Sequence, residues 1–275
     1  MGVSIKQFHA LIIHSKMATK EGSSYESYDA GKGLVLSITN SIFGKLDESE
    51  QGNIKYRQGS ELDLEEISAC FKGSSLDVTF RRKNNATKYD MKRAIKDVKS
   101  TLKSDKSFKF LMILIGSHGK SENGKTYVFD VDNDFLDVEE DLIQPFYNHQ
   151  FPEFSGRPKI FFINCCRGVL PYRFEPKHDG IKSSVKRPLE SLRGDMCIVW
   201  STTDGSLSLR LATKGSPLIQ TLCQMIMDKA KCNSLSSTEF AGLLNEVQWE
   251  VASDSGVQIV VDNKLAKPFY LTLTG

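Results

Sequence analysis

Short apolar runs of strand length alternate along the chain with segments in which apolar residues recur every three or four positions. A strand that is covered on both faces gives a nearly continuous apolar run, so these runs predict buried strands. They lie at residues 33–39, 77–80, 108–115, 159–163, 195–202 and 256–261. A further run at residues 127–131 predicts an exposed hairpin strand.

The amphipathic segments between the runs predict helices, and a residue suited to cap a helix precedes each of them. The expected caps are Ser60, Thr87, Asp137, Ser216 and Ser236. Asp63 and Glu239 follow two of these serines by three residues, as the carboxylate of a capping box does. Strands that alternate with helices predict an α/β fold with a mostly parallel sheet and helices on both faces.

Charge and hydropathy exclude several classes of partner. The chain of 275 residues has 36 Lys and Arg against 34 Asp and Glu, so its net charge of +2 favours neither nucleic acid nor an anionic membrane. No apolar run reaches the length of a membrane span, and the N-terminus has no signal-peptide pattern. We therefore expect a cytoplasmic protein with no nucleic-acid or membrane partner.

The cysteines are expected to be reduced thiols. Cys70, Cys197 and Cys223 fall inside apolar patterns, and Cys165 and Cys166 are adjacent in the chain. No Cys-x-x-Cys pair occurs and the five histidines are scattered, so we expect neither a metal nor a cofactor.

Two segments lack apolar periodicity. Residues 1–27 are polar and predict a short leader or mobile tail. Residues 169–193 contain three prolines and no amphipathic pattern, and such long connections usually have a function or are disordered. The folded domain is therefore expected at residues 28–275, with a linker at 169–193.

Two predicted strands end in side chains that can do chemistry. The first is followed by Gly116-Ser117-His118-Gly119, the second by Asn164-Cys165-Cys166-Arg167-Gly168. Ligands bind beyond the carboxyl ends of parallel strands, so His118 and a cysteine are expected to lie together. Taken singly, each cysteine would more often be a small buried hydrophobe.

A cysteine nucleophile needs an imidazole to manage protons and backbone N–H groups where negative charge develops. Gly119 and the amide of Cys166 are placed to supply such donors, and a glycine lets the backbone approach a substrate closely. The pattern predicts acyl transfer, the hydrolysis of a peptide bond through a thioester. Gly119-Lys120-Ser121 is also similar to a phosphate-binding loop, but Leu114 stands where that loop requires glycine, so nucleotide binding is not expected.

At these residues the chain resembles the caspase family, whose signature is Gln-Ala-Cys-[Arg/Gln/Gly]-Gly with a histidine about 50 residues upstream. Residues 164–168 and His118 match that pattern closely. Further similarity occurs in order at residues 57–60, at residues 200–202 leading to Arg210, and at residues 215–220. The resemblance extends over residues 25–275 and implies a caspase-like, mostly parallel six-stranded sheet.

The resemblance implies roles for particular residues. Cys166 would be the nucleophile, His118 the general acid and base, and Gly119 with the Cys166 amide the oxyanion hole. The residues that would bind the substrate aspartate are Arg57, Asn164, Ser208 and Arg210. Paired guanidiniums suit this role because they bind a carboxylate through charge-assisted hydrogen bonds. Protein or peptide substrates with aspartate before the scissile bond are therefore expected.

The resemblance also implies processing and pairing. A cut after Asp179, which precedes Gly180, would give a large part, 28–179, and a small part, 180–275. Asp29 is a second candidate processing site, with a structural role as the alternative. The strand at 256–261 would pair two catalytic units, as a homodimer or as a dimer with another caspase.

Three departures from the family pattern affect these expectations. Asn164 replaces glutamine and is one methylene shorter, which is expected to weaken the aspartate pocket. Cys165 replaces alanine, and inward packing is favoured over oxidation. Leu207, Leu209 and Leu211 surround Arg210 in place of aromatic residues, so the flanking subsites are expected to be aliphatic and not to favour a second acidic residue.

Two hypotheses follow from the sequence. The first is an active cysteine endopeptidase that cuts after aspartate in apoptotic or related proteolytic signalling. The second is a catalytically weak or inactive homologue that binds and regulates an active caspase. A relative directed at lysine or arginine ranks last, because its pocket would need acidic residues in place of Arg57 and Arg210.

Overall fold

The computed structural model describes residues 26–44, 56–168 and 193–274, and a six-stranded sheet lies at its centre. The strand order is β2-β1-β3-β7-β8-β9, and all neighbours pair in parallel except β8 and β9. The strands are β1 (Gly33–Thr39), β2 (Val78–Asn84), β3 (Phe110–Gly116), β7 (Lys159–Asn164), β8 (Met196–Trp200) and β9 (Val260–Asn263). The prediction of a mostly parallel sheet is confirmed.

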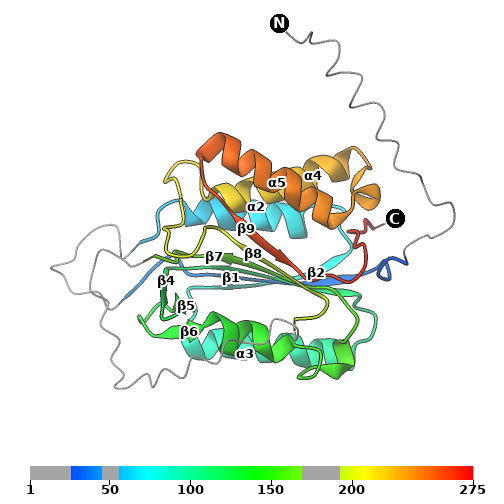
Figure 1. Cartoon of the computed structure of the whole chain (residues 1–275), viewed down its shortest axis with the longest axis horizontal. Helices are drawn as coiled ribbons and strands as arrows, with labels where there is room; N and C mark the ends of the chain where they lie inside the picture. The colour runs from blue at the N-terminus through cyan, green and yellow to red at the C-terminus, as the bar shows by residue number, and fades with distance from the viewer. Residues whose placement is uncertain (1–25, 45–55, 169–192, 275) are drawn as a thin grey trace, which may run out of the picture.

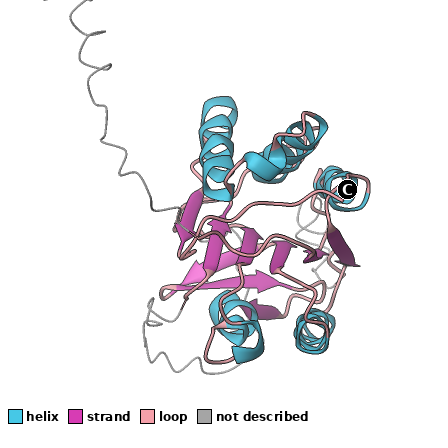
Figure 2. Cartoon of the chain, turned by 90° about the vertical axis from the view of Figure 1, so that its right-hand side faces the viewer, coloured by secondary structure: helices cyan, strands magenta, loops and turns pink. Residues whose placement is uncertain are grey.

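Helices cover both faces of this sheet (Figures 1 and 2). The helices α2 (Ser60–Lys72), α4 (Pro217–Lys231) and α5 (Phe240–Ser255) lie on one face. The helix α3 (Lys88–Ser104) and a π-helical turn, Val138–Ile143, lie on the other. The three-layer arrangement explains why the central strands are apolar throughout, since each of their faces packs against helices.

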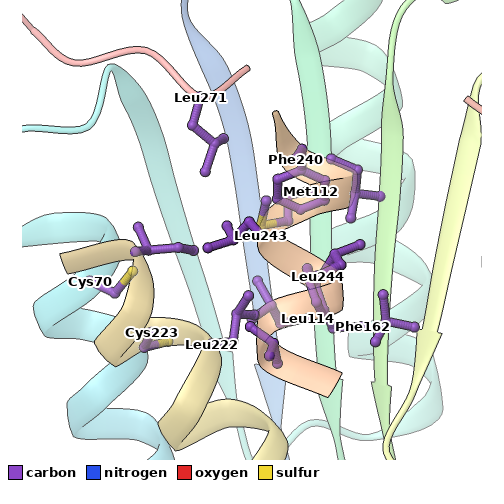
Figure 3. Close-up of a cluster of buried hydrophobic side chains, with 14 of the residues drawn as sticks. Cys70, Met112, Leu114, Phe162, Leu222, Cys223, Phe240, Leu243, Leu244 and Leu271 are labelled. Carbon is purple, nitrogen blue, oxygen red and sulfur yellow. The ribbon is translucent and has the colours of Figure 1, made fainter. Parts of the chain in front are cut away.

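Alternate side chains of β3 enter the two cores in turn. Met112 and Leu114 pack on the side of α4 and α5, whereas Leu111 and Ile113 pack on the side of α3. Figure 3 shows Met112 and Leu114 facing the side chains that α5 contributes to the first core, among them Leu244. This alternation follows from the two-residue period of a strand.

A small antiparallel sheet projects beyond the carboxyl end of β3. It consists of β4 (Gly119–Glu122), β5 (Lys125–Phe129) and β6 (Phe135–Asp137). The predicted exposed strand at 127–131 is β5, and the prediction of exposure is wrong, because residues 126–129 are buried. They are covered because β5 pairs on both sides and Val128 packs into the core beside α3.

Three predicted caps stand at the start of their segments. Ser216 precedes Pro217 at the start of α4 but makes no side-chain capping bond, whereas the other two cap through their side chains. Thr87 caps α3 and forms a capping box with Asp90. The side chain of Asp137 accepts hydrogen bonds from the backbone N–H groups of Glu139 and Glu140, although the segment that follows is a π-helical turn rather than an α-helix. A 3₁₀ turn, Gln144–Phe146, continues it.

The two capping boxes predicted at Ser60 and Ser236 are wrong. The helix α2 begins at Ser60 itself, after Gly59 in a left-handed conformation with φ 82°. Ser236 lies in a separate 3₁₀ turn, Leu235–Ser237, and Glu239 caps α5 by accepting the N–H of Gly242. The helix α2 thus starts after a left-handed glycine, and α5 is capped by Glu239 in place of the predicted serine.

The last strand starts later than predicted. Gly256 ends α5 in a left-handed conformation, with φ 69°, and so it belongs to the helix cap. The strand β9 therefore spans Val260–Asn263 and forms one edge of the sheet.

Some predictions fall on residues outside the described ranges. These are most of the leader at 1–27 and nearly all of the linker at 169–193, including Asp179. Asp29 is described, is exposed, and forms an ion pair with Lys109 at 3.3 Å. Among the described helices, none combines the length and apolarity needed to cross a membrane.

Candidate active site

The pairing of β3 with β7 brings the two reactive segments together. Gly116 and Asn164 are register partners at the carboxyl ends of these neighbouring strands. His118 and Cys166 each follow one of these partners by two residues, so both lie at the same edge of the sheet. The predicted convergence at this edge is therefore present in the fold.

The segment that carries His118 is fixed by the small antiparallel sheet. The carbonyl oxygen of His118 accepts the N–H of Phe129 at 2.9 Å, and Ser117 Oγ donates to the carbonyl oxygen of Phe129 at 2.5 Å. The imidazole is partly buried and lies against the ring of Phe43, with 4.7 Å between the ring centroids. Backbone and ring contacts together position this side chain.

The two adjacent cysteines occupy different environments. Cys165 is 1% exposed, and burial raises the pKa of its thiol to about 12. The prediction that Cys165 packs inward is confirmed. Cys166 is partly exposed, and its Sγ lies 4.0 Å from the carbonyl oxygen of Ser208. Only Cys166 of this pair is therefore placed to meet a substrate.

Gly119 is constrained by packing as well as by its position after the histidine. A Cβ at this residue would lie 2.7 Å from the carbonyl oxygen of Tyr127 and 2.8 Å from Sγ of Cys165. Substrate access was the reason that the sequence suggested for this glycine. The structure adds a second reason, because the Cys165 side chain occupies the space beside it.

Arg57 is a buried cation that pairs with no carboxylate among the described residues. It is 1% exposed, and its Nη1 donates to the carbonyl oxygen of Asn40 at 2.8 Å. Within the described ranges, its buried Nε has no hydrogen-bond partner. Burial is the main cause that lowers its pKa to about 9, and the charge of Arg210 acts in the same direction. Its Nη1 also lies 3.7 Å from where a Cβ on Gly116 would stand, which places it over the end of β3.

Arg210 approaches from the other end of the chain. Its Nε donates to the carbonyl oxygen of Gln58 at 2.8 Å, and burial lowers its pKa. Among the described residues, no carboxylate oxygen lies within 4.0 Å of either guanidinium. Two neighbouring cations without ion pairs form a site that suits an anionic group.

The two other predicted pocket residues contact each other. Ser208 Oγ lies 3.3 Å from Asn164 Oδ1 and 2.8 Å from Ser201 Oγ, and these two oxygens share its single hydroxyl hydrogen. Asn164 is 3% exposed, and its Nδ2 donates to Ser216 Oγ at 2.7 Å. The shorter side chain that replaces glutamine is thus tied to the start of α4.

Two residues at the site were not identified from the sequence. Asp63 accepts hydrogen bonds from the backbone and hydroxyl of Ser216, and both residues are buried. Their sequence pattern predicted helix capping, and no local signal distinguishes that role from this contact. Arg167 was noted only as part of the cysteine motif, yet it stacks on Trp200 at 4.3 Å and pairs with Asp204 at 3.4 Å.

The arrangement has the parts needed for thiol chemistry beside an anion site. It contains a partly exposed thiol, an imidazole at the same sheet edge and two guanidiniums free of ion pairs among the described residues. Within the described ranges, no group of three or more His, Cys, Asp or Glu side chains is arranged to hold a metal ion.

Comparison with known proteins places this site in a family. The family model of the caspase domain matches residues 32–270. Caspase drICE of Drosophila melanogaster is 29% identical over 227 residues, which cover 79% of this chain and 61% of that protein. Mouse caspase-3 is 27% identical over 259 residues, which cover 91% of this chain and 85% of that protein.

A solved structure shows the same fold. The crystal structure of caspase-1 from Spodoptera frugiperda matches with a TM-score of 0.66 and 20% identity, over 89% of this chain and 91% of that one. The family match covers most of the described domain, including His118, Cys166 and both arginines. The chain therefore belongs to the caspase family of cysteine proteases.

Proposed function

We propose that the protein is a cysteine endopeptidase that cleaves peptide bonds after aspartate. One observation carries the proposal: Arg57 and Arg210 lie near each other at the site, and no described carboxylate pairs with either guanidinium. A buried arginine without an anion is unfavourable, so a ligand carboxylate would relieve this cost. Aspartate supplies that carboxylate on a short side chain.

The reaction would proceed through a thioester. The Cys166 thiol gives its proton to the His118 imidazole, and the sulfur attacks the main-chain carbonyl carbon of the substrate aspartate. The N–H groups of Gly119 and Cys166 would stabilise the oxyanion. The C–N bond breaks as the imidazolium protonates the leaving amine, and water then hydrolyses the thioester through the same base. No cofactor takes part in these steps.

Substrate preference would be set by the segment around Arg210. Leu207 is 56% exposed and Leu211 is 40% exposed, so apolar side chains flank the arginine. We propose that aliphatic residues upstream of the aspartate are preferred over acidic ones. Asn164 would weaken the pocket, because a lost hydrogen bond to a charged group costs about 1.5 to 3 kcal/mol, roughly tenfold or more in kcat/KM.

The test is a panel of acyl-peptide fluorogenic substrates that end in Asp, Asn or Glu. Wild type is expected to cleave only the Asp series, and Cys166→Ala is expected to be inactive. Cys165→Ala is the matched control, because it removes the neighbouring thiol and should retain activity. Equal signals from wild type and Cys166→Ala, with no labelling of Cys166 by an aspartyl electrophile, would remove the proposal.

A second candidate function is a weak or inactive homologue that binds and regulates an active caspase. The observation that favours it is the Asn164 amide, whose Nδ2 is engaged by Ser216. This candidate predicts that the purified chain changes the rate of an active caspase while Cys166→Ala has the same effect. An endopeptidase would lose its own activity in that variant.

We also propose how the protein dimerises and where in the cell it acts. The edge strand β9 would join two catalytic units, either two copies of this chain or this chain and another caspase. We place the protein in the cytoplasm, in apoptotic or related proteolytic signalling. Light scattering of purified protein, with and without a charged substitution at Val261 in β9, tests the pairing.

A further inference from the structure

The Asn164 side chain joins segments that reach the site from distant parts of the chain. Its Nδ2 donates to Ser216 Oγ at 2.7 Å, and its Oδ1 lies 3.3 Å from Ser208 Oγ, whose single hydroxyl hydrogen is shared with Ser201 Oγ at 2.8 Å. Asn164 is 3% exposed and Ser216 is 1% exposed. Water therefore cannot replace these bonds easily, and an unmet partner would be costly.

Asp63 holds the Ser216 hydroxyl in one direction. Ser216 Oγ donates to Asp63 Oδ2, and the Ser216 backbone N–H donates to Asp63 Oδ1 at 2.8 Å. A carboxylate only accepts hydrogen bonds, so the single hydroxyl hydrogen of Ser216 is directed at Asp63. The lone pairs of that hydroxyl therefore face Asn164 and accept from its N–H side.

The direction of these bonds fixes the Asn164 amide. With Nδ2 toward Ser216, Oδ1 faces Ser208, which lies two residues before Arg210. The carbonyl oxygen of Ser208 in turn lies 4.0 Å from Cys166 Sγ. A carboxylate on α2 is thus linked, through three side chains, to the segment beside the thiol.

Asp63 itself remains apart from the cations. Besides Ser216, its Oδ1 accepts from Gln220 Nε2 at 3.0 Å, and it forms no ion pair with Arg57 or Arg210. Its negative charge still favours the protonated form of both arginines. The Asp63 carboxylate can therefore stabilise the charge of both guanidiniums while leaving them available to a ligand carboxylate.

We propose that Asp63 is a positioning residue of the aspartate pocket, acting through the Ser216 hydroxyl on Asn164 and Ser208. The inference rests on the proposed function, because it concerns the site that would bind the substrate aspartate. Asp63 would not touch the substrate. It would set the orientation of the Asn164 amide. The Asn164 side chain is one methylene shorter than glutamine, so its length alone would not bring the amide into position.

A double-mutant cycle tests the link. Ser216→Ala removes the hydroxyl but leaves the start of α4 intact, since this side chain makes no capping bond to the helix. Ser216→Ala and Asn164→Ala are each expected to lower kcat/KM for an acyl-Asp peptide about tenfold. If they act through one hydrogen bond, the double variant loses little more than either single variant. If the two losses multiply, so that kcat/KM of the double variant falls about a hundredfold, the inference is overturned.

Three further measurements separate positioning from a general loss of structure. Gln220→Ala removes a different hydrogen bond to the same carboxylate and is expected to keep the wild-type kcat/KM. Asp63→Asn keeps an acceptor for the Ser216 hydroxyl and should be less impaired than Asp63→Ala. The rate at which iodoacetamide alkylates Cys166 needs no aspartate pocket, so it should stay unchanged in Ser216→Ala. A parallel fall in alkylation would indicate a structural role and contradict the inference.

The two proposals fail in different ways. Wild type that cleaves no acyl-Asp peptide would remove the proposed function, and this inference with it. Wild type that cleaves such peptides while the cycle is additive would remove only the role of Asp63.

Discussion

Gly119 and Cys165 pack so closely that a Cβ on Gly119 would lie 2.8 Å from both Cβ and Sγ of Cys165. The residue after the histidine and the residue before the candidate nucleophile are therefore in direct contact. This contact couples the start of β4 to the loop after β7, where the two halves of the site meet.

Gly119→Ala is expected to destabilise the protein by about 1 to 3 kcal/mol, because the added methyl group overpacks a closed space. Its kcat/KM should also fall, since the His118 loop must shift to make room. Gly242→Ala is the matched control, because a Cβ there meets nothing within 4 Å. Chemical denaturation of both variants measures the difference, and equal stabilities would contradict the packing argument.

The two adjacent thiols should differ in reactivity. Cys166 is partly exposed, whereas Cys165 is buried with its pKa raised to about 12 by burial. At pH 8 the reactive thiolate of Cys165 is scarce as well as inaccessible. Iodoacetamide followed by peptide mapping should find label on Cys166 and on the exposed Cys232, and none on Cys165 in the native protein. If Cys165 is labelled as early as Cys166, the assignment of Cys166 as the reactive thiol of the pair is wrong.

The contact between Gly59 and Leu211 should be necessary for the pocket. Gly59 has φ 82°, and a Cβ there would lie 2.4 Å from the carbonyl oxygen of Leu211. Gly256 has a similar φ of 69° but open space around it. Gly256→Ala should cost only the left-handed strain of about 1 to 2 kcal/mol. Gly59→Ala should cost more and should also reduce kcat/KM, because Arg210 lies beside Leu211; steady-state kinetics and thermal unfolding compare the two.

Lys159 should give stability a specific dependence on pH. It is 1% exposed, and burial lowers its pKa to about 8, below its ordinary value of 10.5. Between these values the unfolded chain binds the extra proton, so this group's contribution to the free energy of unfolding rises with pH, by up to about 1.4 kcal/mol per unit.

The matching variant is Lys159→Met, which lacks the titrating group. The stability of wild type relative to this variant should increase from pH 8 to 10 and stay level below pH 8. The lost hydrogen bonds to Asn148 and Arg157 add an offset that does not vary with pH. Parallel curves for the two proteins would contradict the lowered pKa.

Processing should occur within the predicted linker. Asp179, followed by Gly180, is the only aspartate between residues 167 and 194. A protease that cuts after aspartate should therefore divide its own chain there. Intact-mass analysis of active protein should show two fragments that meet at this position, and Asp179→Ala should remain uncut. An uncut chain with full activity would count against the prediction.

The strands that helices cover on both faces were predictable from the sequence. The strands β1, β3 and β7 read as continuous apolar runs because helices cover both of their faces. The start of β9 was not predictable in the same way. Gly256 reads as the beginning of an apolar strand, but its left-handed conformation ends the preceding helix.

The site residues that directly follow a buried strand were predictable from the sequence. His118 and Cys166 follow two such ends, and the register of β3 with β7 brings them to one edge. The contact of Asp63 with Ser216 could not be found this way, because each residue has a sequence pattern that fits a helix start. The two residues are 153 positions apart in the sequence, and local patterns carry no signal of such distant pairing.

That separation has a consequence for the chain while it is being made. Synthesis through residue 168 delivers both His118 and Cys166, but Arg210 and Ser216 have not yet been added. The carboxylate of Asp63 then has neither its serine nor its second neighbouring cation. The thiol and the imidazole thus exist before the residues that would select a substrate. The proposed selectivity would be completed only when the last quarter of the polypeptide folds against the first.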